Sequence, residues 1–419
     1  MTSKSRLLMI LQTNPYFQKL KTLFGANLIA YYPMWEESGT TVTDISGNAR
    51  NGVYDTVTLN STRSKFNKPS PLFNGDGFAN VYSASLVSAF TPNTLTIGGW
   101  YKAKTMNTFY DGAVGNPFRF LVDANNYVDL LKQSSAEQLS FRFKSGAVAV
   151  KTLNFYGATN NWFFWCITVD KANDLVSIYI NNKKITTLDT LGIWAGSVAE
   201  ASACFGAANT TKANPLIGYL SDCFIASRVA TDAEIVALSK NLPQNTLTIL
   251  GDSISVKSDT SYTTLILSEL TTYFNRNRAV ASMGVVAGAS NLAAQATAAA
   301  SDDADIIIIQ LGSNDDNAGN MGTLQTAYED GIIALKASNT NATIYAMNVL
   351  KRWANQTDGA EVDKSNIRTA IAAACTAQGI TCWDTYTTPW IAQDETSDGI
   401  HPTAAGHAKI AAEVLARLP

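Results

Sequence analysis

The hydrophobic pattern of the chain changes near residue 245, and this change restricts each part to a different class of fold. Before it, short runs rich in β-branched and aromatic residues are bounded by Gly, Asn or Asp, and helical spacing is scarce until residues 231–239. Many short strands separated by turn residues are typical of an antiparallel sandwich or jelly roll. We therefore predict an all-β domain over residues 27–240, whose strands include 27–33, 94–102, 127–131, 162–170 and 176–180.

A short polar linker at residues 241–245 is followed by apolar runs that alternate with helical stretches. Continuous apolar runs such as Ile306–Ile309 are typical of parallel strands that are covered on both faces. The alternation predicts a three-layer α/β/α domain with a five-stranded parallel sheet over residues 246–419. We place its strands at 246–250, 279–283, 305–311, 343–349 and 380–384, and its helices at 261–275, 290–300, 322–337, 361–378 and after Pro402.

Composition narrows the classes of partner. The 419 residues carry a net charge of −3, and only 16% of them are charged, so the surface is built from Asn, Thr, Ser and Gly. No basic block is present, which gives no support to nucleic-acid or anionic-membrane binding. The five cysteines form no CxxC pair, so we expect buried free thiols, although Cys375 and Cys382 are near enough in sequence to meet in space.

Residues 1–26 form a separate N-terminal helical segment, in which Pro15 divides two short amphipathic pieces. Two alternatives stay open: the pieces dock on the following domain, or they join chains together. No apolar run is long enough to span a membrane, and no export signal is evident. The polar, weakly charged composition nevertheless suggests an extracellular or virion setting. The oligomeric state is left open.

Four loops in the second part follow predicted strands, at residues 251–253, 284–290, 312–315 and 397–401. In an open parallel sheet, ligands bind beyond the carboxyl ends of the strands, so these loops should meet at one edge. The chain has only two histidines, His401 and His407, and both lie in its last twenty residues. Because histidine titrates near neutral pH, His401 is the expected acid–base residue of a site at this edge.

The residue types in these loops suit nucleophilic catalysis. Ser253 is a weak nucleophile unless a base takes its proton, and His401 can be that base while Asp398 orients the ring. The oxyanion of the tetrahedral intermediate needs donors, for which we propose the amides of Ser253 and Gly288 and the side chain of Asn314. Glycine at position 288 allows a close backbone approach to the substrate.

The ordered blocks GDS, VAGAS, LGSND and DGIHPTAAGH resemble the SGNH (GDSL-type) hydrolases, a superfamily of esterases, lipases and carbohydrate deacetylases. The resemblance covers residues 246–419 and implies a flavodoxin-like fold and ester hydrolysis through an acyl-enzyme on Ser253. It gives the other four residues named above, His401, Asp398, Gly288 and Asn314, the same roles. Gly284 is the fallback for the second-block glycine. Ser282 or Met283 stands where that family often has asparagine, which loosens the assignment of this glycine.

The first domain is similar to laminin-G-like, concanavalin-A-like jelly rolls in four ordered segments: LIAYYPMWEESGTTVTDISGNARNGVY from residue 28, TLTIGGWYKA from 94, WFFWCITVDKANDLVSIYINNKKI from 162 and IGYLSDCFIASRVATDAEIVAL from 217. The resemblance implies a two-sheet accessory module that often binds carbohydrate or a surface. It also implies a possible structural calcium, for which Asp44 and Asn48 are the candidate ligands. The alternative is that these two residues only make turns.

Other residues near the predicted edge have less specific roles. Trp353 and Trp390 are candidates for stacking on a substrate ring, with packing beneath loops as the alternative. The neighbouring Lys351 and Arg352 are expected to be solvated charges.

Three further residues compete with the proposed site residues. His407 lies in the last predicted helix and is expected to be structural. Asp394 is an alternative partner for His401, at a less suitable spacing. Asp315, like Asp316 after it, is expected to orient the Asn314 loop rather than to catalyse.

The sequence therefore predicts a serine esterase that needs no cofactor and acts on short acyl groups, with acetyl esters of carbohydrate as the favoured substrate. The carbohydrate part rests on association with the jelly roll alone. A lectin-like adhesin or phage-tail binding protein is the alternative from another class, and a lipase or thioesterase is the alternative within the same superfamily.

Overall fold

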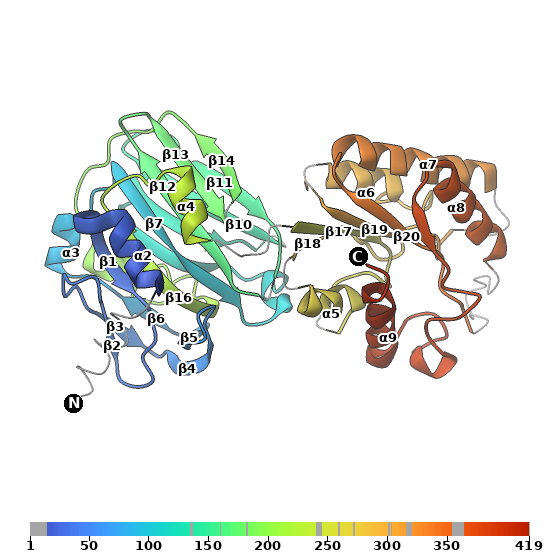
Figure 1. Ribbon diagram of the computed structural model, residues 1–419, viewed down its shortest axis with the longest axis horizontal. Coiled ribbons are helices and arrows are strands. Elements are labelled where there is room, and N and C mark those ends of the chain that lie inside the picture. Colours follow the sequence, from blue (N-terminus) through green and yellow to red (C-terminus); the bar gives the residue numbers. More distant parts are fainter. Residues whose placement is uncertain are drawn as a thin grey trace. The chain divides into compact units, whose positions relative to one another are not determined.

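The computed structural model describes residues 15–134, 137–159, 161–181, 183–239, 245–258, 260–270, 273–300, 302, 304–315, 321–353 and 364–418. The chain divides into two compact units, Met1–Gln244 and Asn245–Pro419, each with its own hydrophobic core (Figure 1). No helix in the described ranges is long and apolar enough to cross a bilayer. All five cysteines are free thiols.

The first unit is a sandwich of two antiparallel sheets, which confirms the predicted jelly-roll class (Figure 1). One sheet has the order β14-β13-β12-β7-β16-β5-β4, with β1 also paired to β16, and the other has the order β11-β10-β9-β8-β15-β6-β3-β2. The inner faces pack through aromatic rings: Trp165 of one sheet stacks on Phe118 of the other with ring centroids 4.8 Å apart. Such burial of large apolar side chains is the main force that holds the two sheets together.

The strands of the first sheet are β1 Leu28–Tyr32, β4 Thr58–Arg63, β5 Pro69–Asn74, β7 Thr94–Ala103, β12 Phe163–Asp170, β13 Leu175–Ile180, β14 Lys183–Leu188 and β16 Ile217–Ala226. Those of the second sheet are β2 Thr41–Val42, β3 Gly52–Asp55, β6 Phe78–Asn80, β8 Gly115–Asp123, β9 Asn126–Lys132, β10 Gln138–Ser145, β11 Lys151–Tyr156 and β15 Ala203–Phe205. The helices are α2 Pro15–Phe24, α3 Ala84–Ala89 and α4 Asp232–Leu238, with short 3-10 turns η1 Gly25–Asn27, η2 Met106–Phe109 and η3 Glu200–Ser202.

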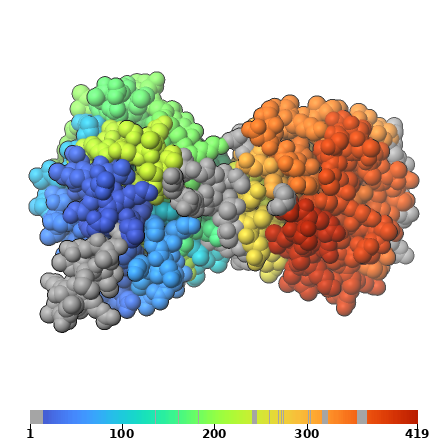
Figure 2. Space-filling view, in the orientation of Figure 1, coloured from blue at the N-terminus to red at the C-terminus, as the bar shows by residue number. Residues whose placement is uncertain are grey.

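Helix α2 docks on the sandwich rather than projecting from it. Its apolar face buries Tyr16, Phe17, Leu20 and Phe24, and the Phe17 ring stacks on Tyr31 of β1 at 5.6 Å. Helices α2 and α4 lie side by side on the outside of this unit (Figures 1 and 2). The docking alternative therefore holds for this helix, whereas the first amphipathic piece, at residues 7–11, lies outside the described residues.

The second unit is a three-layer α/β/α domain, as predicted. Its five parallel strands have the order β18-β17-β19-β20-β21, which is the flavodoxin-like order 2-1-3-4-5. Helices α6, α7 and α8 pack on one face of the sheet, and α5 and α9 lie together on the other (Figure 1). The strands are β17 Asn245–Gly251, β18 Tyr273–Asn277, β19 Ile306–Gln310, β20 Thr343–Met347 and β21 Thr381–Trp383. The helices are α5 Tyr262–Glu269, α6 Leu292–Ala299, α7 Met321–Ser338, α8 Ser365–Ala377 and α9 Ala404–Leu415, with the 3-10 turn η4 Gln393–Glu395.

The prediction of a second strand at residues 279–283 is wrong, because the strand is the more polar segment Tyr273–Asn277. The preceding helix is correspondingly shorter than predicted and ends at Glu269. Tertiary partners stabilise the polar strand: Arg276 pairs with Asp302 at 3.0 Å, and the Asn277 side chain donates to the Ser255 carbonyl at 2.8 Å. These partners are distant in sequence, so the local apolar pattern pointed to the wrong segment.

Candidate active site

The strand order reverses between β17 and β19, which is where ligands bind in doubly wound sheets. Ser253 follows β17 at this point, and its Oγ lies 3.0 Å from Nε2 of His401 in the loop before α9. Nδ1 of His401 lies 2.6 Å from Oδ2 of Asp398. The side chains of Ser253, His401 and Asp398, up to 148 residues apart in sequence, thus form a continuous chain of hydrogen bonds.

The loop from residue 396 to residue 402 is built around the Asp398 carboxylate. Its Oδ1 accepts the amides of Ile400 at 2.9 Å and His401 at 2.7 Å, so the carboxylate fixes both the backbone and the ring of the histidine. Gly399 has a φ of +81°, which glycine adopts without strain. Desolvation acts to raise the pKa of Asp398, but the hydrogen bonds from the His401 ring and the two amides outweigh it and lower that pKa to about 2. The alternative carboxylate, Asp394, is exposed in η4, and the ring nitrogen it would bind already contacts Asp398.

A buried polar network lies beneath the Ser253 loop, and the sequence analysis did not assign it. The Asp252 carboxylate accepts the Ile254 amide at 3.0 Å and Nε2 of Gln310 at 3.3 Å. Gln310 also accepts the Ser255 hydroxyl at 2.7 Å, and this hydroxyl lies 2.6 Å from that of Tyr262. Burial raises the pKa of Asp252 to about 6. The polar Gln310 within the otherwise apolar run 306–311 is the one signal in the sequence that could have indicated this network.

Asp315 organises the loop that follows β18. Its Oδ2 accepts the amide of Val285 at 2.6 Å, and its Oδ1 accepts those of Val286 at 3.0 Å and Ala287 at 3.2 Å. Gly284 lies so close that a Cβ there would clash with the carboxylate. Asp315 therefore orients residues 285–287 rather than the Asn314 loop, which was the expectation from the sequence, while Asp316 lies outside the described residues.

The same loop distinguishes the two candidate oxyanion glycines. The Gly284 amide donates to the Ala287 carbonyl at 2.9 Å, whereas the Gly288 amide has no acceptor within the described part of the chain. Gly288 has a φ of +84°, and a Cβ there would clash with the Met283 sulfur. The Nδ2 of Asn314 donates one hydrogen to the Met283 carbonyl at 2.9 Å, which leaves its second hydrogen for another acceptor. This arrangement favours Gly288 over Gly284 as an oxyanion donor.

The other histidine has a structural environment, as expected. Nδ1 of His407 accepts the Tyr262 amide at 3.3 Å, and the two rings stack with their centroids 6.3 Å apart. Desolvation lowers the pKa of His407 to about 4, so this ring is neutral near pH 7.

The two candidate stacking tryptophans differ in accessibility. Trp390 is only 5% exposed and packs against Trp383 and beneath the Arg417 guanidinium, so it cannot stack on a substrate in this structure. Trp353 is partly exposed and is tied to the His401 loop, because its amide donates to the Gly399 carbonyl at 2.9 Å. The Lys351 ammonium lies 4.3 Å from the Trp353 ring centroid and covers one face of the ring.

The expectation that Arg352 is a solvated charge is wrong. Its side chain is buried and donates to the Ser313 carbonyl, next to Asn314. It therefore supports the loop that carries the predicted asparagine.

The proposed calcium ligands in the first unit are engaged in hydrogen bonds. Asp44 accepts the amides of Tyr31, Ser46 and Arg50 at 2.9–3.0 Å, and the Asn48 amide group donates to the Leu28 and Ile29 carbonyls. A calcium ion would have to displace these donors from the Asp44 oxygens. Within the described ranges, no group of three or more His, Cys, Asp or Glu side chains is arranged to hold a metal. The calcium prediction can be tested by titration.

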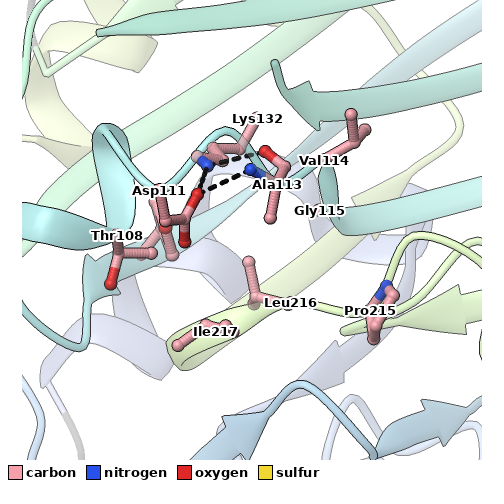
Figure 3. Close-up of a pocket in the computed structure, with 10 residues that line it drawn as sticks. Thr108, Asp111, Ala113, Val114, Gly115, Lys132, Pro215, Leu216 and Ile217 are labelled. Carbon is pink, nitrogen blue, oxygen red and sulfur yellow. Dashed lines mark hydrogen bonds and ion pairs between the residues drawn. The ribbon is translucent and has the colours of Figure 1, made fainter. Parts of the chain in front are cut away.

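A small cavity is lined by Gly115 at the start of β8, Lys132 at the end of β9 and Ile217 at the start of β16 (Figure 3). Lys132 points toward Asp111 and Ala113, forming an ion pair with the carboxylate and donating to the Ala113 carbonyl at 2.7 Å. The cavity volume is about 10 Å³, which is room for about one water molecule. It is therefore too small to hold a sugar ring.

The two units resemble different groups of known proteins. Residues 249–409 match the model of the GDSL-like Lipase/Acylhydrolase family. None of the proteins of curated function matches the chain.

Solved structures resemble the β-sandwich at low identity. Domain 4 of AbnA, an extracellular GH43 arabinanase from Geobacillus stearothermophilus, solved with arabinotriose, is 16% identical, with a TM-score of 0.40, over 51% of this chain and 98% of that one. The binding domain of botulinum neurotoxin serotype D is 18% identical, with a TM-score of 0.39, over 53% and 54%. The binding domain of Paraclostridial mosquitocidal protein 1 is 19% identical, with a TM-score of 0.38, over 52% and 54%. This chain spans about half the length of the two toxin domains.

The family match contains every loop at the carboxyl edge of the parallel sheet, from the Ser253 loop to the His401 loop. Residues 249–409 therefore form a GDSL-like lipase/acylhydrolase domain, which supports an ester hydrolase of the esterase or lipase type.

Proposed function

We propose that the second unit hydrolyses short-chain carboxylic esters through an acyl-enzyme on Ser253. The observation that carries the proposal is the continuous row from the Ser253 hydroxyl through the His401 ring to the Asp398 carboxylate, at 3.0 and 2.6 Å. Both distances are within the range for direct proton transfer and for ring orientation.

Acylation begins when Ser253 Oγ attacks the ester carbonyl and Nε2 of His401 takes its proton. The resulting oxyanion is held by the amides of Ser253 and Gly288 and by the second Nδ2 hydrogen of Asn314. As the tetrahedral intermediate collapses, the ester C–O bond breaks and His401 returns the proton to the leaving alcohol. Asp398 stays ionised throughout, and it stabilises the imidazolium and keeps the Nδ1–H tautomer.

Deacylation repeats these steps with water. His401 takes a proton from the water as its oxygen attacks the acyl carbonyl, and the same donors hold the second oxyanion. Collapse of this intermediate breaks the acyl–Ser253 bond and releases the carboxylic acid, while His401 returns the proton to Ser253. Neither step consumes a cofactor, so we propose that none is required.

We propose an acetylated glycan as the substrate. The His401 and Asp398 side chains are 45% and 43% exposed, which suits a bulky polymeric alcohol that approaches from solvent. The polar, weakly charged composition and the attached jelly roll agree with a carbohydrate target. The carbohydrate part remains an inference from association with that module.

The decisive variant is Ser253→Ala, assayed with p-nitrophenyl acetate. We expect turnover to fall to background while the melting temperature is nearly unchanged, because only a hydroxyl is removed. Ser338→Ala is the matched control, since its hydroxyl caps the end of α7 by donating to the Ala334 carbonyl. Turnover retained in Ser253→Ala would refute the proposed nucleophile.

Two further assays identify the substrate. Release of acetate from a panel of acetylated polysaccharides supports the glycan esterase, whereas rates that increase from acetyl to palmitoyl esters point to a lipase or thioesterase. Glycan binding by a chain that hydrolyses no ester would favour the adhesin.

A further inference from the structure

Gln295 is a buried side chain that joins two loops of the active site. It lies in α6, is 3% exposed, and its Oε1 accepts the Gly251 amide at 2.8 Å. Its Nε2 donates to the Gly251 carbonyl at 3.0 Å and to the Ser290 carbonyl at 2.9 Å. Both side-chain amide hydrogens and the side-chain oxygen of Gln295 thus form hydrogen bonds with main-chain atoms.

The two bound residues flank the proposed oxyanion donors. Gly251 ends β17 two residues before Ser253, and Ser290 follows Gly288 by two residues. A side chain that holds both of them restricts the distance between the Ser253 amide and the Gly288 amide. Oxyanion donors are effective only when they are aimed beforehand at the position where charge develops, so this restriction bears on the rate.

No other described contact replaces this link. The Asp315 carboxylate holds residues 285–287 but does not reach the Ser253 loop, and the Asp252–Gln310 network holds the Ser253 loop but does not reach residues 284–290. Among the described residues, Gln295 is the side chain that hydrogen-bonds to both loops.

We propose that Gln295 is a positioning residue of the esterase, which sets the separation of the two oxyanion-hole amides without touching the substrate. This inference rests on the proposed function. A purely structural role is the alternative, in which the buried amide contributes to folding stability and has no particular effect on the rate.

Asn339 provides a matched control for that alternative. It is also 3% exposed, and its Oδ1 accepts the Ala304 amide at 2.9 Å while its Nδ2 donates to the Ala299 carbonyl at 3.3 Å. It therefore joins main-chain segments as Gln295 does, but at the amino end of β19, the opposite end from Ser253. Asn339→Leu and Gln295→Met each keep the approximate side-chain volume and remove the hydrogen bonds.

The experiment compares the full-length chain with Gln295→Met, Gln295→Glu and Asn339→Leu. It measures kcat and KM for p-nitrophenyl acetate, inhibition by phenylboronate, which forms a tetrahedral adduct with a nucleophilic serine, and the melting temperature. For Gln295→Met we expect kcat to fall by at least about tenfold with KM within about twofold, and phenylboronate affinity to fall in parallel. Asn339→Leu should lose melting temperature but keep kcat and phenylboronate affinity.

Gln295→Glu covers the case in which the Met variant does not fold. It keeps the acceptor for the Gly251 amide and removes the donors to both carbonyls, so we expect the same loss of kcat. Unchanged kcat in either folded Gln295 variant, or an equal loss in Asn339→Leu, would overturn the positioning role alone. A wild-type chain that hydrolyses no ester would overturn the proposed function, and the inference with it.

Discussion

Asp315→Asn tests whether the shape of residues 284–288 controls catalysis. The carboxylate is 2% exposed and accepts three consecutive amides at 2.6, 3.0 and 3.2 Å. An asparagine in its place has one acceptor oxygen and one NH2 group, so in either orientation its NH2 faces at least one backbone N–H. The substitution thus loses at least one charge-assisted hydrogen bond and places two donors against each other.

The expected magnitudes follow from these contacts. A hydrogen bond to a charged group contributes about 1.5–3 kcal/mol, so the free energy of unfolding should fall by about 3 kcal/mol. Complete loss of one oxyanion donor costs about 10²–10³ in kcat. Because Gly288 adjoins the released segment and is displaced rather than removed, we expect kcat for p-nitrophenyl acetate to fall by about 10- to 100-fold.

The control is Asp302→Asn, whose carboxylate binds Thr248 of β17 and Arg276 of β18 and, in the described part of the chain, forms no hydrogen bond with residues 284–288. Asp302 is also buried and accepts Arg276 at 3.0 Å and Thr248 at 3.1 Å, so its replacement should destabilise the domain to a similar or greater degree. Its kcat, measured well below the melting temperature, should stay near that of the wild type. A kcat for Asp315→Asn that equals that of Asp302→Asn would refute the reasoning.

Three further predictions concern pH and calcium. Because hydrogen bonds lower the pKa of Asp398 to about 2, this carboxylate stays ionised to about pH 3 and can orient the His401 ring throughout that range. Asp398→Asn should therefore lower kcat for p-nitrophenyl acetate at every pH above about 3, and a variant that keeps the full rate would contradict the orienting role. Burial raises the pKa of Asp222 from 3.8 to about 7, so the free energy of unfolding should rise as the pH falls from 7 toward 4, by at most about 4 kcal/mol. Asp222→Asn should raise the melting temperature at pH 8 and remove this pH dependence. A variant with the pH profile of the wild type would contradict the role of Asp222. Because hydrogen-bond donors occupy the Asp44 carboxylate, millimolar calcium should leave the melting temperature unchanged. A calcium-dependent increase in melting temperature that Asp44→Ala abolishes would instead establish the calcium site.

The sequence was sufficient for the fold because the strongest apolar runs coincide with the central strands. Ile306–Ile309 lies within β19, and the runs near residues 246 and 343 became its two neighbours, β17 and β20. Parallel strands covered on both faces leave few alternatives for such runs. The loops that follow β17 and β19 then had to meet at one edge, which is why Ser253 and Asn314 could be proposed from the sequence.

What the sequence did not indicate is how that edge is held in shape. The edge strand β18 has hydrogen-bonded neighbours on one side only, so its polar side chains are selected by partners such as Asp302 rather than by an apolar pattern. Gln295 and Asp315 bind backbone amides and carbonyls, which every residue carries, and the partners are 44 and 30 residues away for Gly251 and Val285. When a side chain binds the main chain, the partner can be any residue type, so the sequence contains no complementary side chain that would reveal the contact.

The same reasoning explains why positions that look unremarkable in the sequence can be decisive for this site. The proposed nucleophile, base and orienting carboxylate are recognisable because their chemistry demands particular side chains. The proposed oxyanion donors are mostly backbone amides, so their function would depend on conformation, and buried Gln295 and Asp315 hold the conformation of the loops that carry them. Variants at these two positions should therefore keep the full set of reacting groups and still lose rate, which separates positioning from chemistry in this domain.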